Sequence, residues 1–244
     1  MRAIWLRSVA AAGIAGAVLL TAGCGIIGPT MRTEGSAQLD TTITEVRVDS
    51  SSGSVNVSGS DDDEGSLEWV VSTRANRTIG PTYSVDGSTL VLSGCGRWCS
   101  VDYTVRVPEG VDVTGRTANG AIDLSDVGEV DMQTTNGRIT LDGASGRVRA
   151  SSSNGRIEGE GLVGTGVEVS TSNGSVELEL ASAQDVSAES SNGSIDVRVP
   201  DGSYRVETQT SNGREEVRIP TSDTGRHLID LRTSNGSIRV EPAG

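Results

Sequence analysis

Hydrophobic and polar residues alternate along most of the chain from about residue 43 onward. The segments EVRVDSSSGSVNV and GVEVSTSNGSVELEL place valine or leucine at every second position on either side of a short run rich in Ser and Gly. Side chains of a β-strand point to opposite faces in turn, so a period of two predicts half-buried strands joined by tight corners. No stretch beyond the first two dozen residues shows a helical period, and valine, isoleucine and threonine favour strands. We therefore expect an all-β protein.

The dipeptide Asn-Gly recurs seven times in the second half of the chain, at intervals of 17, 18, 19, 19, 20 and 23 residues. The pairs are Asn119-Gly120, Asn136-Gly137, Asn154-Gly155, Asn173-Gly174, Asn192-Gly193, Asn212-Gly213 and Asn235-Gly236. Each pair stands between two apolar-x-apolar segments. One unit departs from this pattern, because the apolar position expected after Gly213 is occupied by Glu215. That unit is expected to bulge or open.

Two architectures fit this repeat. Asn-Gly is a strong hairpin signal, so the units could be antiparallel β-hairpins in a sandwich or barrel. Some fourteen strands would then need closure or splitting, because open sheets rarely exceed about 10 strands. The other architecture is a single-domain β-solenoid, in which each unit of about 19 residues is one coil with Asn-Gly at a corner. We favour the solenoid, because stacked corners explain the recurrence: each Asn can bond the next one along a ladder.

The N-terminus has the plan of an export signal. Arg2 and Arg7 precede an apolar run over residues 8–20, which is too short to span a bilayer comfortably. Small residues then lead to Cys24, and this arrangement resembles the bacterial lipoprotein signal, although Thr21 stands where the usual box has Leu. The resemblance implies that Cys24 is lipidated and anchors the protein to the outer face of the bacterial cell membrane. We expect a signal peptide over 1–23, a lipidated tether over 24–42 and one β-repeat domain over 43–244.

Two further cysteines, Cys95 and Cys99, lie in GCGRWCS. Outside the cytoplasm a disulfide between them is the expected pairing. Zinc would require additional Cys or His ligands, and the only histidine, His227, is far along the chain. Residues 66–107 also hold two of the three tryptophans and two of the three tyrosines, and we expect this section to close one end of the fold.

Charge narrows the range of partners. Removal of residues 1–23 would take away two of the 20 basic residues and none of the 33 acidic ones, leaving a formal charge of −15. An acidic protein without a basic stripe is not expected to bind nucleic acid. Contact with the membrane is therefore expected to depend on the lipid at Cys24.

The sequence gives little sign of catalysis. A Ser-His-Asp triad would depend on His227, and a lysine base is excluded because the chain contains no lysine. Carboxylates such as Glu177 and Glu179 share a strand face, as do Asp196 and Arg198, but alternating charges on an outward face also serve solubility. We expect no catalytic residue, no metal site and no cofactor. A polysaccharide-active enzyme on a β-helix is the alternative.

The strand-and-turn units EVRVDSSSGSVNVSG and VDYTVRVPEGVDVTGRTANGAIDL, with the later SNG-x-[IV] units, resemble the bacterial putative-adhesin family of β-strand-repeat domains. The resemblance covers roughly residues 43–240. It implies a stacked β-repeat fold exposed on the cell envelope, and it supplies no catalytic residue. The expected function is a non-catalytic envelope lipoprotein that presents a rigid surface for binding a cell-wall polymer, an envelope protein or an external surface. Envelope-stress sensing and a purely structural spacer are compatible alternatives.

Overall fold

The computed structural model describes residues 30–62, 65–74 and 78–244. The proposed signal peptide and Cys24 lie outside this range. The described residues form 21 β-strands in two sheets. No helix among them is long and apolar enough to cross a bilayer. The prediction of an all-β fold is confirmed.

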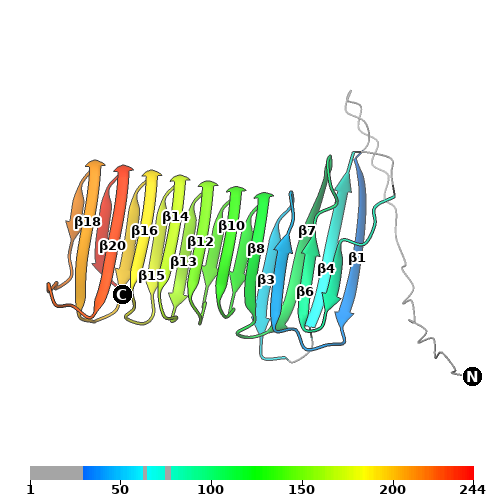
Figure 1. Cartoon of the computed structure of the whole chain (residues 1–244), viewed down its shortest axis with the longest axis horizontal. Helices are drawn as coiled ribbons and strands as arrows, with labels where there is room; N and C mark the ends of the chain where they lie inside the picture. Colours follow the sequence, from blue (N-terminus) through cyan, green and yellow to red (C-terminus); the bar gives the residue numbers. More distant parts are fainter. Residues whose placement is uncertain (1–29, 63–64, 75–77) are drawn as a thin grey trace, which may run out of the picture.

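The two sheets face each other along one elongated stack (Figure 1). In spatial order the first sheet, here called sheet A, contains β1 (Met31–Leu39), β4 (Gly65–Thr73), β7 (Cys99–Pro108), β3 (Val55–Ser60), β9 (Ile122–Ser125), β11 (Ile139–Asp142), β13 (Ile157–Leu162), β15 (Val176–Leu180), β17 (Ile195–Val199), β21 (Ile238–Pro242) and β19 (Glu215–Val217). In spatial order the second, sheet B, contains β18 (Tyr204–Asn212), β20 (His227–Asn235), β16 (Val186–Asn192), β14 (Val167–Asn173), β12 (Val148–Asn154), β10 (Val130–Asn136), β8 (Asp112–Asn119), β2 (Glu45–Asp49), β6 (Thr89–Ser93) and β5 (Tyr83–Asp86).

Each repeat unit contributes one strand to each sheet. In the unit that contains β10 and β11, the chain runs along sheet B, turns at Asn136-Gly137 and returns along sheet A. Like strands of successive units pair in parallel and in register, so that Val130 lies beside Val148 and Ile139 beside Ile157. This is the β-solenoid expected from the sequence. The hairpin alternative is wrong, because the two strands around each Asn-Gly belong to different sheets.

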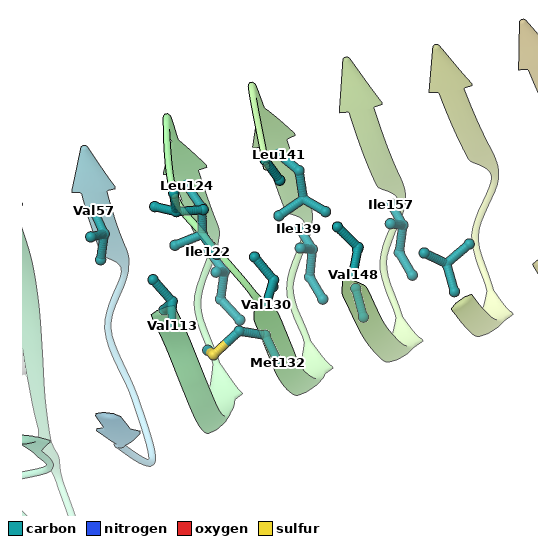
Figure 2. Close-up of a cluster of buried hydrophobic side chains, with 14 of the residues drawn as sticks. Val57, Val113, Ile122, Leu124, Val130, Met132, Ile139, Leu141, Val148 and Ile157 are labelled. Atoms are coloured by element: carbon teal, nitrogen blue, oxygen red, sulfur yellow. The ribbon is translucent and has the colours of Figure 1, made fainter. Parts of the chain in front are cut away.

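The apolar side chains at alternate strand positions fill the space between the two sheets. Val130 and Met132 of β10 and Ile139 and Leu141 of β11 are all fully buried. Figure 2 shows these side chains meeting between the two sheets. Because every coil repeats the arrangement, the core continues along the stack, and each coil buries its apolar face against its neighbours.

The order of the coils in space differs from their order in the chain at both ends of the stack. The first coil, β2 and β3, lies between the coil of β6 and β7 and that of β8 and β9. The last coil, β20 and β21, lies between the coil of β16 and β17 and that of β18 and β19. The first and last two-strand coils of the chain are therefore both held inside the stack.

The aromatic section closes one end of the stack, as expected. Strand β4 pairs antiparallel with β7, β1 pairs antiparallel with β4, and β5 pairs antiparallel with β6. A tether was expected over residues 24–42, but Met31–Leu39 form strand β1 and are part of the fold. This strand buries only Leu39, so it carries no hydrophobic alternation and is held mainly by its backbone pairing with β4.

The other end of the stack is closed by polar groups. Glu215 of β19 occupies the inward position that Ile238 occupies in the neighbouring β21. Its carboxylate accepts hydrogen bonds from the Thr208 hydroxyl at 2.7 Å and the Thr210 backbone N–H at 2.9 Å. The departure noticed in the sequence thus marks the terminal coil, where an apolar side chain would have no further coil to cover it.

Candidate binding groove on sheet B

One corner of the solenoid is built from a continuous ladder of asparagines. Each side-chain amide after the first donates from Nδ2 to Oδ1 of the preceding rung, in six hydrogen bonds of 2.9–3.1 Å. The rungs in spatial order are Asn119, Asn136, Asn154, Asn173, Asn192, Asn235 and Asn212. At the first rung, Asn119 donates to the Ser51 carbonyl oxygen at 3.2 Å. The ladder expected from stacking is present.

The glycine after each asparagine is required by close contact between coils. A Cβ atom added at Gly155 would overlap the carbonyl oxygen of Gly137, and one at Gly174 would overlap that of Gly155. The asparagines of these corners do not have a positive φ, as type I′ hairpin turns would require. The Asn-Gly signal therefore reflects stacking of backbones and not a hairpin turn.

Inside the corner, a second row of hydroxyls supports the glycines. Ser152 donates to the Gly137 carbonyl oxygen at 3.1 Å, and Thr171 donates to that of Gly155 at 2.9 Å. These side chains are buried, so the bonds satisfy polar groups that would otherwise be costly to bury. They fix the corner from within and leave the outward residues free to form a surface.

Beside this corner, the outer face of sheet B holds a groove of about 750 Å³. Its lining is almost wholly small and uncharged: Ser50, Ser51, Gly94, Gly96, Thr117, Ala118, Gln133, Thr134, Thr135, Ser151, Ser152, Ser153, Ser170 and Ser172, with Asp49 and Arg116 as the charged members. The groove crosses β2, β8, β10, β12 and β14. Side chains as small as serine form its floor, which explains the hollow.

The register of the strands shows which side chains border the groove on each side. Asn154 and Asn173 of the ladder follow directly after Ser153 and Ser172. On the other side, two residues before Ser151 and Ser170, stand Arg149 and Glu168, which pair at 3.6 Å. The groove thus runs across the strands between an amide ladder and a charged row. Neighbouring strands are about 4.8 Å apart, so its exposed hydroxyls repeat at that interval.

The outer face of sheet A has a different character. Arg156 lies 3.0 Å from Glu158 and 3.7 Å from Glu177, and Arg239 lies 2.9 Å from Asp196. Arg218 pairs with Glu216, and this contact lowers the pKa of the Glu216 carboxyl. The outer face of sheet A thus carries many ion pairs, whereas the groove on the outer face of sheet B is lined mainly by hydroxyl and amide groups.

The carboxylates considered for catalysis lie on this charged face. A hollow of about 210 Å³ is lined by Glu177, Asp196, Val197, Arg198, Arg239 and Glu241. Acids of the hollow lie beside arginines: Glu177 is 3.7 Å from Arg156, and Asp196 is 2.9 Å from Arg239. Outside the lining, Glu179 lies 3.5 Å from Arg198. Each of these carboxylates is therefore one member of a partly exposed ion pair. The arrangement is that of a solvated ion-pair face.

His227 lies near the far end of the stack, away from the groove lining. Its ring is 6.1 Å from that of Tyr204, and its Nδ1 is 3.7 Å from a carboxylate oxygen of Asp185. That oxygen also accepts the Leu228 backbone N–H at 2.9 Å. Among the described residues, no group of three or more His, Cys, Asp or Glu side chains could hold a metal ion.

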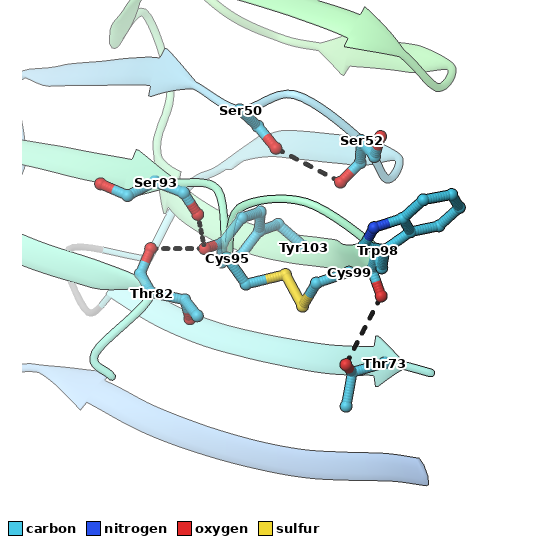
Figure 3. Close-up of a disulfide and its surroundings, with 9 residues drawn as sticks. All are labelled: Ser50, Ser52, Thr73, Thr82, Ser93, Cys95, Trp98, Cys99 and Tyr103. Carbon is cyan, nitrogen blue, oxygen red and sulfur yellow. Dashed lines mark hydrogen bonds between the residues drawn. A yellow bond between two sulfur atoms is a disulfide. The ribbon is translucent and has the colours of Figure 1, made fainter. Parts of the chain in front are cut away.

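The disulfide loop forms the end of the groove. Cys95 and Cys99 are joined, with Cα atoms 5.7 Å apart (Figure 3). Beneath the loop, the buried Tyr103 hydroxyl donates to the Ser93 carbonyl oxygen at 2.7 Å and also lies within reach of that of Thr82. Burial raises the pKa of Tyr103 to about 12. The loop therefore sits on a fixed polar contact in the core.

The stacked two-sheet fold places the protein in the class of β-solenoids. It belongs to the Toastrack DUF4097 family, whose model matches residues 38–241. The family resemblance inferred from the sequence is confirmed. No curated protein matches the chain.

Solved structures with a similar fold are described as putative adhesins. One from Parabacteroides merdae is 11% identical with a TM-score of 0.47, and the match covers 87% of this chain and 96% of that one. One from Parabacteroides distasonis is 16% identical with a TM-score of 0.47, over 88% and 98%. One from Bacteroides fragilis is 15% identical with a TM-score of 0.43, over 86% and 97%.

Sequence reasoning identified the Asn-Gly corners but not the groove beside them. Gln133 and Arg116 carried no motif, and the hollow depends on which small side chains become neighbours across strands. The exposed Trp98 in the disulfide loop was also not singled out from the sequence. Its position between two linked cysteines was the available signal, because such a residue is expected on a surface loop.

Proposed function

We propose that this protein is a non-catalytic binding module of the bacterial cell envelope, exported and anchored through lipid on Cys24, and that the groove on sheet B takes a neutral polysaccharide. The solenoid serves as a rigid support. The envelope location rests on the signal-like N-terminus, and the ligand class rests on the groove.

The observation that carries the proposal is the groove's lining. A neutral sugar polymer presents hydroxyls at regular intervals, and serine, threonine and asparagine can both donate to and accept from them. Ser153 and Ser172 are exposed and in register on adjacent strands. The excess of 33 acidic over 20 basic residues in the whole chain repels acidic polymers. A volume of about 750 Å³ is within the usual range of binding sites.

The test is a binding assay with a matched pair of variants. Mannan, arabinogalactan and dextran are used as neutral probes, with polygalacturonate as an acidic control. Ser153→Glu places bulk and charge in the groove, whereas Ser234→Glu makes the same change at the matching outward position of β20, which does not line it.

We expect the wild-type protein to bind at least one neutral probe in affinity electrophoresis. Ser153→Glu should weaken that binding about tenfold or more, which corresponds to about 1.4 kcal/mol. Ser234→Glu should leave the affinity within about twofold of wild type. Equal effects of the two variants would place the binding face elsewhere. Shortening of the polymer chains by the wild-type protein would support the enzyme alternative instead.

A further inference from the structure

Trp98 is unusual for this protein. Its exposed fraction is 72%, the largest among the exposed large hydrophobic residues of the described part of the chain, the next being Met31 at 48%. Aromatic residues make up only 2% of the sequence. An indole held in water forgoes a large hydrophobic gain. Trp98 is therefore available for contact with a ligand.

The backbone beneath Trp98 is fixed. The residue has a φ of 63°, a left-handed conformation that bulky side chains rarely adopt. Its carbonyl oxygen accepts hydrogen bonds from the Arg74 N–H at 3.3 Å and the Thr73 hydroxyl at 3.4 Å. The adjacent Cys99 is buried and linked to Cys95. Surroundings that hold a residue in such a conformation are a recurrent feature of ligand sites.

These constraints direct the ring outward. Figure 3 shows the indole of Trp98 projecting from the loop, away from Tyr103 and the disulfide. A loop whose backbone is already fixed loses less conformational freedom when a ligand arrives. The loop thus presents a flat apolar surface at a defined place.

The loop that carries Trp98 closes the end of the groove, although Trp98 itself is not one of the lining residues. Gly94 and Gly96 of the same loop line the groove. Gly94 donates its N–H to the Asp49 carbonyl oxygen at 3.1 Å, which ties the loop to the end of β2. Just beyond the loop, Val101 donates to the Ser52 carbonyl oxygen at 3.0 Å. The loop is therefore the corner of the coil stacked next to the β2–β3 corner, at the groove's N-terminal end.

We propose that Trp98 is the platform on which one sugar ring of a neutral polysaccharide stacks, while the chain continues along the hydroxyls of the groove. This inference rests on the proposed function and adds an anchoring residue to it. A pyranose ring has an apolar face of C–H groups and a rim of hydroxyls. The indole face matches the first, and the serines and threonines of the groove match the second.

The surroundings favour a sugar over a protein partner. Hot spots of protein interfaces cluster in well-packed patches from which water is excluded. Gly96 and Arg97 beside Trp98 are exposed, and Ser50 and Ser51 of the adjoining corner are polar. A single ring in polar surroundings suits a ligand that is itself mostly polar.

The test combines binding and fluorescence with the same neutral probes. Trp98→Asn removes the ring but suits the positive φ, because asparagine tolerates that conformation. Trp98→Phe keeps an aromatic face. Val163→Asn is the matched control, since Val163 is 47% exposed and does not line the groove. Melting temperatures of all variants establish that they are folded.

We expect Trp98→Asn to weaken binding of the neutral probe about 10- to 100-fold, Trp98→Phe to restore most of it, and Val163→Asn to change nothing. These steps correspond to about 1.4–2.8 kcal/mol. Iodide quenching of tryptophan fluorescence is measured for wild type and for Trp98→Phe, and the difference between them reports on Trp98 alone. This difference should decrease when a probe that binds is added.

The outcomes separate this inference from the proposed function. If the wild-type protein binds none of the neutral probes, both fail. If it binds and Ser153→Glu abolishes binding while Trp98→Asn binds normally, only the role of Trp98 is overturned. If Trp98→Asn keeps the glycan but loses an envelope protein that co-purifies with wild type, Trp98 serves a protein partner and the inference is wrong.

Discussion

The side chain of Asn235 donates to that of Asn192 at 3.0 Å, although 43 residues separate them along the chain. Asn212, which is nearer to Asn192 in sequence, lies one rung further out and donates to Asn235. The coil of β20 and β21 is thus inserted between two coils that precede it in the sequence. A coil held between two others has no free edge, so β20 and β21 are protected from pairing with other molecules.

The ladder itself should contribute measurable stability. Asn154→Ala removes one donated and one accepted rung, whereas Asn212→Ala, at the end, removes only a donated one. A typical hydrogen bond contributes about 0.5–1.5 kcal/mol net. We expect Asn154→Ala to lower the free energy of unfolding in urea by about 1–2 kcal/mol, and Asn212→Ala by about half as much. Equal losses would mean that the rungs do not act as a ladder.

The corner glycines should resist even the smallest side chain. In Gly155→Ala the added methyl meets the backbone of Gly137, which cannot rotate away. Overpacking of this kind costs about 1–3 kcal/mol, and a lower melting temperature should report it. Gly80→Ala is the control, because nothing lies within 4 Å of its Cβ position. A Gly155→Ala protein as stable as this control would contradict the close stacking of coils.

Glu215 should keep the end of the stack from associating with other molecules. Glu215→Val restores the apolar position of the repeat and frees the Thr210 N–H, so that both the apolar end and the edge of β18 become available. We expect its sedimentation coefficient to rise with protein concentration more steeply than that of wild type. Glu216→Val, which removes the neighbouring outward acid, should behave as wild type. Equal behaviour of the two variants would remove this role from Glu215.

Tyr103 should make the fold sensitive to alkali. Its pKa is about 12 in the folded protein and about 10 when unfolded. The raised value means that the neutral phenol stabilises the fold fully below pH 10 and that this contribution is lost as pH rises toward 12. The loss is about 1.4 kcal/mol per pH unit for one proton.

Tyr103→Phe provides the comparison. It should be less stable at neutral pH, because the Thr82 and Ser93 carbonyl oxygens lose a donor. Between about pH 10 and pH 12 its urea midpoint should fall less steeply than that of wild type. Parallel slopes would show that the buried phenol does not titrate as described.

Sequence patterns predicted the strands of this fold better than they predicted which strands lie next to each other. Val167 and Val169 alternate with polar residues and lie inward, as such a period requires. The regular Asn-Gly spacing identified the coils. Every rung, however, offers the same amide and the same backbone, so nothing local distinguishes Asn235 from Asn212 as the partner of Asn192. The exchange of coils at the ends could not be predicted for that reason.

The candidate site shows the same limit. A groove arises where several small side chains from different strands meet, and Ser153 becomes important only because Ser172 and Thr135 are its neighbours. Glu215 was recognised as a departure from the repeat, but its role depends on being at the end of the stack. Strand β1 lacked a hydrophobic pattern, so its backbone pairing left no trace in the sequence.

The most direct test of the account is photocrosslinking in living cells from inside and outside the groove. A benzophenone amino acid replaces Ser153 in one protein and Ser234 in another, and adducts are analysed for carbohydrate and for protein. If the groove on sheet B binds a polysaccharide, position 153 gives carbohydrate-bearing adducts that are absent from position 234. Protein adducts alone from position 153, or the same carbohydrate from both positions, would contradict a polysaccharide-binding groove on sheet B.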